Sequence, residues 1–174
     1  MKIGLAMMAG RRLHGLLPAL SCLLLAIIGA APLGLPHFGM VGPAMALMAV
    51  FYWSIFRADL MTMLGAFGIG LVVDLLSGGP VGLNAVLLLL THALAVSQRR
   101  VFLGSSFLVN WWGFGMVALG AAIIGWAVAC LLNWHLHDPR PLLAQLGLSL
   151  GLYPLVYWLL SRLEQRMLRP ALPI

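Results

Sequence analysis

The feature that most constrains the fold is a series of long apolar runs, separated by short segments that hold most of the charged residues. Only 8% of the 174 residues are charged and 63% are hydrophobic, whereas a soluble domain carries about 25% charged residues. A water-soluble globular fold is therefore excluded. Because a membrane span takes about 20 residues, we predict an all-α integral membrane protein, a bundle of about six transmembrane helices in a single domain over residues 1–174.

The apolar runs predict the positions of the spans. We expect six spans at residues 13–31, 41–56, 60–77, 83–97, 113–133 and 142–160, followed by a short basic cytoplasmic tail at residues 161–174. The first run is longer than the 7–15-residue apolar core of a signal peptide, and Pro32 directly follows the small residues at which such a peptide would be cut. We therefore interpret it as a span rather than as a cleaved signal.

The basic residues predict the orientation. With the amino terminus inside, the outer segments hold only Arg140, and the inner segments hold Lys2, Arg11, Arg12, Arg57, Arg99, Arg100, Arg162, Arg166 and Arg169. This is the positive-inside pattern, so both termini should be cytoplasmic and the turn at residues 77–82 should lie outside. Because the basic residues are spread over several short segments, we exclude a nucleic-acid-binding surface.

Asp74 is the one carboxylate inside an apolar span, near the carboxyl end of its helix. The carboxyl end of a helix carries a partial negative charge and repels an anion, so another group must stabilise the carboxylate. Backbone N–H groups of the glycine turn, the side chain of Asn84 or a partner's donor are the candidates. We favour a structural role for Asp74 in the turn, with part of a partner-binding surface or a transport site as alternatives.

Glycines and a proline supply the other candidate residues. Gly78, Gly79, Pro80 and Gly82 form the main helix-breaking cluster of the chain, which predicts a sharp turn. Gly147 and Gly151 form a G-x-x-x-G pair, and Ala66 with Gly70, Gly42 with Ala46 and Gly125 with Ala129 have the same spacing. Such pairs let helix backbones approach closely in lipid, either within the bundle or against another protein's helix.

Residue types that could support catalysis or metal binding are few. His92 lies mid-span without a second ionisable residue at its depth, so we interpret it as a packed, hydrogen-bonded residue rather than a proton relay. His135, His137 and Asp138 share one outer loop, which is not the ligand set of a tetrahedral zinc site. Cys22 and Cys130 lie at different depths and should be unpaired. We expect no enzyme activity, no cofactor and no metal.

Two segments resemble a known family. Residues 53–60 read WSIFRADL, and residues 70–84 read GLVVDLLSGGPVGLN. They resemble MreD, the rod shape-determining membrane protein family of bacteria, whose signature is G-L-x-x-D-[LI]-L-x-G-x-P-[LF]-G. Residues 147–166 are similar to the last helix of that family. Together the similar segments cover roughly half of the chain. Val81 and Ala58 depart from the family pattern, and Ala58 weakens the match in the inner turn.

The resemblance implies a non-catalytic subunit of the cell-elongation complex in the bacterial cytoplasmic membrane. Such a subunit binds MreC, a bitopic protein, and through it acts with the RodA glycan polymerase, a class B penicillin-binding protein and MreB filaments in peptidoglycan synthesis. The partner-interface candidates are then Asp74, Gly78, Gly79, Pro80, Gly82, Asn84, Gly147 and Gly151. Membrane lipids are the other expected partners.

The resemblance also implies a rival function. The family is similar in fold to the substrate-binding subunits of energy-coupling-factor transporters, so a small-solute-binding subunit is the alternative. The residues favour the scaffold, because only Asp74, Asn84 and the outer histidines are available to line a polar pocket. A lipid-modifying enzyme is weaker still, since four acidic residues in the whole chain leave little for a metal site.

Overall fold

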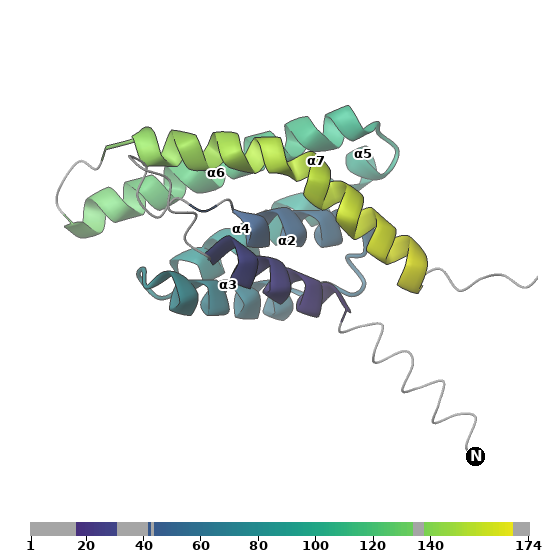
Figure 1. Ribbon diagram of the computed structural model, residues 1–174, viewed down its shortest axis with the longest axis horizontal. Coiled ribbons are helices and arrows are strands. Elements are labelled where there is room, and N and C mark those ends of the chain that lie inside the picture. Colours follow the sequence, from purple (N-terminus) through teal and green to yellow (C-terminus); the bar gives the residue numbers. More distant parts are fainter. Residues whose placement is uncertain (1–16, 31–41, 43, 134–137, 169–174) are drawn as a thin grey trace, which may run out of the picture.

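The computed structural model describes residues 17–30, 42, 44–133 and 138–168, and every regular element within these residues is a helix. The all-α prediction is therefore confirmed. After a first helix over Leu17–Ala30 come α2 (Met45–Phe56), α3 (Met63–Ser77), α4 (Leu83–Ser97), α5 (Arg99–Leu103), α6 (Phe107–Asn133) and α7 (Arg140–Leu168). Figure 1 shows α6 and α7 side by side along one edge, with the first helix, α2, α3 and α4 beside them.

Helix α2 is the centre of the bundle. Every residue from Ala46 to Ile55 is buried, and α2 contacts all the other labelled helices. Apart from Ser54 and the hydroxyl of Tyr52, its side chains are apolar on every face, as expected for a helix that is surrounded by protein. Trp53 is fully buried, and its indole Nε1–H donates a hydrogen bond of 2.8 Å to Ser21 Oγ in the first helix. This bond joins the first helix to the core.

Helix length separates two elements from the rest. Within the described residues, Phe107–Leu132 and Arg140–Arg166 are each long and apolar enough to cross a membrane. The other apolar helices have 10–17 residues, and a 15-residue helix is about 22 Å long, less than the ~30 Å hydrocarbon core. Six complete spans therefore stay a prediction. Residues 13–16 and 31 of the expected first span lie outside the described residues.

The helices extend beyond several of the expected spans. Helix α6 begins at Phe107 rather than near Gly113, and α7 continues to Leu168, so the first part of the expected tail belongs to the last helix. The short helix α5 was not expected from the sequence. The 29 residues of α7 extend about 43 Å, which is longer than the ~30 Å apolar core of a bilayer. A helix of this length can cross the core and continue beyond the membrane surface.

Helix α7 bends at Pro154. Figure 1 shows its last part turning away from α6 and crossing the end of α2. A proline inside a helix removes one backbone hydrogen bond and kinks the chain. The bend brings Glu164 against α2, where Tyr52 Oη donates to Glu164 Oε2 at 2.9 Å and Arg57 Nε donates to Glu164 Oε1 at 3.2 Å.

The charged residues divide the bundle into two ends. One end, here named the arginine end, holds five of the six arginines in the described residues: Arg57, Arg99, Arg100, Arg162 and Arg166. Arg140 lies at the opposite end, together with the start of α4 and the end of α3. We name this the Asn84 end. The division agrees with the charge pattern from which the orientation was predicted.

Candidate functional site

The Asp74 carboxylate lies at the junction of α3 and α4 and is 1% exposed. Its Oδ2 accepts hydrogen bonds from the backbone N–H groups of Gly82 at 2.8 Å and Ala85 at 3.3 Å, and its Oδ1 accepts one from Asn84 N–H at 2.9 Å. The first N–H groups of a helix have no partner within the helix, and the helix dipole attracts an anion there. The start of α4 therefore stabilises a carboxylate that the end of α3 repels.

Two glycines fix the shape of the turn between these helices. Gly78 has φ +65°, and its N–H donates to the carbonyl oxygen of Asp74 at 3.1 Å, which closes α3 with a left-handed residue. Gly82 has φ +102° and precedes α4. Side chains disfavour both angles. We name residues 74–85 the Asp74 turn; its donors are backbone groups, whereas the side chain of Asn84 takes no part.

Close packing of α3 on α4 continues from this turn. Ala66 is fully buried, and a methyl group added to Gly70 would collide with the backbone of Ala85. The small-residue pair at positions 66 and 70 therefore packs inside the molecule.

The pair on α7 behaves differently. Gly147 and Gly151 are both exposed, and a Cβ atom added to either would meet nothing within 4 Å. Among the residues that the structure describes, the glycine face of α7 is therefore open, and the choice between packing within the bundle and packing against another protein's helix stays a prediction.

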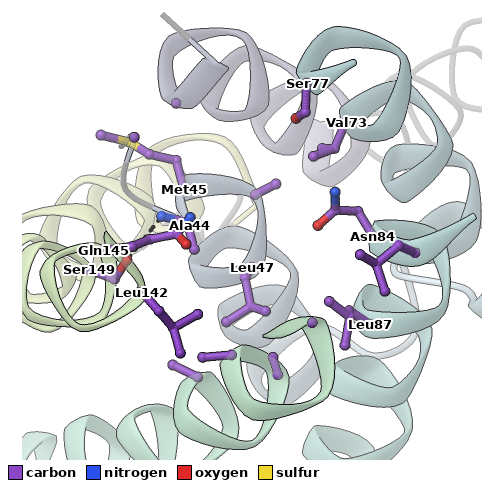
Figure 2. Close-up of a pocket in the computed structure, with 18 of the residues that line it drawn as sticks. Ala44, Met45, Leu47, Val73, Ser77, Asn84, Leu87, Leu142, Gln145 and Ser149 are labelled. Carbon is purple, nitrogen blue, oxygen red and sulfur yellow. Dashed lines mark hydrogen bonds between the residues drawn. The ribbon is translucent and has the colours of Figure 1, made fainter. Parts of the chain in front are cut away.

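A cavity of about 620 Å³ lies at the Asn84 end, between the first helix, α2, α3, α4, α6 and α7. Alanine and glycine make up much of its lining, which keeps the space between the helices free. Figure 2 shows Asn84 projecting from α4 toward α2, with Ser77 on α3 and Gln145 on α7 at other sides of the cavity. Ser149 Oγ accepts a hydrogen bond from Ala44 N–H at 3.0 Å, joining α7 to the start of α2.

The cavity presents neutral polar groups. The side-chain amides of Asn84 and Gln145 have no hydrogen-bond partner among the described residues, and each offers a donor and an acceptor. Among the described lining residues, the exposed Asp138 is the one that carries a charge. Asp74 does not line it, because both of its oxygens face the backbone of α4. The described lining is mostly apolar with a few polar side chains, which suits a small, largely apolar molecule.

His92 is the one histidine among the described residues, and it is packed between helices. His92 is buried in α4, and its Nδ1 lies 2.8 Å from Ser54 Oγ on α2. This agrees with the interpretation of His92 as a packed, hydrogen-bonded residue. His135 and His137 lie outside the described residues, and the part of the chain that is described has no group of three metal-ligating side chains.

Sequence reasoning missed Gln145 and Ser149. They lie one helical turn apart on α7, so both face the same side of the helix. The spacing of these two polar residues within an apolar run could have predicted a shared polar face. Only the packing of α7 on α2 shows which cavity that face lines.

These elements define an all-helical membrane protein with a rigid turn and a cavity at one end. The comparisons with known proteins specify the family. The model of the rod shape-determining protein MreD matches residues 10–163. The chain therefore belongs to the MreD family, which confirms the resemblance found in the sequence. The comparisons with curated proteins and with solved structures gave no match.

Proposed function

We propose that this chain is a non-catalytic membrane subunit of the bacterial cell-elongation complex. Membership of the MreD family carries the proposal and supports a role in determining rod shape. In this proposal the chain binds an MreC-type bitopic protein, and through it supports peptidoglycan synthesis with a RodA-type polymerase, a class B penicillin-binding protein and MreB filaments.

The proposed topology is six spans in the inner membrane with both termini in the cytoplasm. The gathering of five arginines at one end of the described bundle supports this orientation. The arginine end then faces the cytoplasm, and the Asn84 end, with the Asp74 turn, faces the outside.

Two features support docking of a partner helix. The Asp74 turn holds α3 and α4 against each other by bonds that need no partner. The open face of α7 at Gly147 and Gly151 lets another helix backbone approach closely. We propose that the partner's transmembrane helix packs on the α7 face, in a bundle whose shape the Asp74 turn maintains.

The test is quantitative co-purification of a tagged MreC-type protein, normalised to the abundance of this chain in the membrane. Gly151→Leu should reduce co-purification at unchanged abundance. Gly68→Leu is the matched control, because a Cβ atom at Gly68 on α3 also meets nothing within 4 Å. Equal binding by the two variants would exclude the α7 face.

A second variant tests the turn. Asp74→Ala should lower abundance and co-purification together, since the carboxylate stabilises the fold rather than contacting the partner. Normal abundance with normal binding would count against both a structural and an interfacial role.

The cavity at the Asn84 end favours one alternative, a small-solute-binding subunit of an energy-coupling-factor-type transporter. The free amides of Asn84 and Gln145 are the groups that would bind such a solute. Purification in mild detergent separates the two functions. An MreC-type protein in the eluate supports the scaffold, and an ATP-binding-cassette module supports the transporter.

A further inference from the structure

A second cavity, of about 550 Å³, lies between α4 and α6. We name it the α4–α6 groove. Its walls are apolar side chains such as Leu90, Leu94 and Met116. Thr91 is one of its two polar lining residues, and its hydroxyl already donates to the carbonyl oxygen of Leu87 at 2.8 Å. The wall therefore has almost nothing to offer a polar ligand.

The dimensions of the groove correspond to one leaflet of a bilayer. Along α4 it extends from Leu87 to Gln98, about 16 Å at the rise of an α-helix. Half of a ~30 Å hydrocarbon core is about 15 Å. Small residues of α6 hollow the opposite wall, and a Cβ atom added to Gly120 would meet nothing within 4 Å. The length of the groove therefore suits a hydrocarbon chain that extends across one leaflet.

One end of the groove is basic. Gln98 lines that end, and Arg99 and Arg100 follow it directly. These two arginines are the only charged residues in α4, α5 and α6, which contain no acidic residue. Arg99 Nε donates to the carbonyl oxygen of Ile55 at 2.8 Å, which fixes the position of this segment on α2, whereas Arg100 is exposed. Among the described residues, neither Arg99 nor Arg100 forms an ion pair with an acidic side chain, so positive charge lies where the apolar groove ends.

We propose that the α4–α6 groove binds an anionic phospholipid. One acyl chain lies along α4 and α6 past Gly120, and the negatively charged headgroup lies beside Arg100. Basic sites at the cytoplasmic ends of membrane helices attract such headgroups. In the orientation proposed above, the lipid belongs to the inner leaflet.

The experiment is native mass spectrometry of the full chain purified in mild detergent and supplied with equal amounts of phosphatidylglycerol and phosphatidylethanolamine. The wild-type chain should retain phosphatidylglycerol in preference. Gly120→Leu should lose most of the retained lipid, because its side chain fills the groove, whereas Gly68→Leu on α3 should retain it. Arg100→Gln should reduce phosphatidylglycerol retention about fivefold, and Arg140→Gln, at the other end of the bundle, should not.

Three results would overturn the proposal. Equal retention of the two phospholipids would exclude recognition of the negative charge. Unchanged retention in Gly120→Leu would place the lipid elsewhere. A photo-crosslinker at Met116 that captures a protein helix rather than lipid would assign the groove to a protein. If Gly120→Leu fails to accumulate, Leu90→Trp provides the same test from the other wall, because Leu90 is an exposed lining residue.

Discussion

Replacing Asp74 by alanine removes both oxygens that accept hydrogen bonds from the first turn of α4. Three backbone N–H groups, those of Gly82, Asn84 and Ala85, lose their partner in one substitution. The side chain is 1% exposed, so the change also leaves a small gap between α3 and α4. No other carboxylate lies in the described part of this junction. The perturbation is therefore confined to one cluster of bonds.

The size of the effect follows from those bonds. Loss of a helix N-cap costs about 0.5–2 kcal/mol, and a hydrogen bond to a charged group contributes about 1.5–3 kcal/mol. Gly82 and Asn84 are half-buried, so water replaces part of what they lose, and the bond from Ala85 is the longest at 3.3 Å. We expect Asp74→Ala to lower the free energy of unfolding by about 3 kcal/mol. Asp74→Asn keeps one acceptor oxygen and should lose about half of that.

The assay is reversible unfolding of the purified chain in mixed micelles with increasing dodecyl sulfate, monitored by tryptophan fluorescence. Asp59→Ala is the matched control. Asp59 is also an aspartate beside a helix, but its side chain is 59% exposed and lies 4.0 Å from Arg57. Exposed ion pairs contribute about 0–1 kcal/mol, so this variant should unfold close to the wild type.

The order of the variants decides the outcome. The expected order of stability is wild type, Asp59→Ala, Asp74→Asn and Asp74→Ala. If Asp74→Ala unfolds at the same denaturant concentration as Asp59→Ala, the carboxylate does not stabilise the turn, and our reasoning from the three hydrogen bonds fails. If Asp74→Asn is no more stable to denaturant than Asp74→Ala, a hydrogen-bond acceptor at this position is not what stabilises the turn.

Three further predictions follow from the backbone and the charge pattern. Gly82→Val should reduce the amount of folded protein in the membrane, because Gly82 has φ +102°, an angle that a side chain disfavours. Gly79→Val should have little effect, because both positions have space for a side chain and Gly79 has no positive φ. Equal yields of the two variants in fluorescence-detected gel filtration would refute this prediction. Gly70→Ala should lower the unfolding midpoint, because its methyl group meets the backbone of α4, and Gly68→Ala should not; the same unfolding assay compares them. In the proposed topology the carboxyl terminus is cytoplasmic, so a fluorescent protein fused after Ile174 should fluoresce and a phosphatase fused there should be inactive. With the amino terminus inside, the reverse result would require an odd number of spans.

Local features of this fold could be predicted from the sequence. The turn at Gly78 to Gly82 needs glycine at defined positions, and its bonds to Asp74 join residues at most 11 positions apart. The carboxylate of Asp74 at the carboxyl end of a helix, followed by glycines and a proline, was therefore enough to predict the turn. It also predicted that hydrogen-bond donors must compensate the carboxylate. The order of the helices follows from the apolar runs, and the gathering of arginines at one end of the bundle follows from the basic residues between those runs.

Distant contacts could not be predicted in the same way. The bond from Ala44 to Ser149 and the bond from Tyr52 to Glu164 join residues more than 100 positions apart. Both depend on how α7 crosses α2 after its bend at Pro154. In a membrane, apolar faces toward lipid and toward protein look alike in sequence, so the pattern did not show that α2 is surrounded or that the α7 glycine pair is open. The cavity and its amide residues followed only from that packing.

The short distance along the chain between Asp74 and its donors has a consequence for biosynthesis. A carboxylate entering a bilayer must be satisfied or protonated at once, and in this chain the donors leave the ribosome only a few residues later. The α3–α4 hairpin can therefore satisfy its own carboxylate with hydrogen bonds during insertion, before the remaining helices have been made. In the proposed six-span topology, these bonds let α3 and α4 enter the membrane as one unit, with the turn that joins them on the outer side.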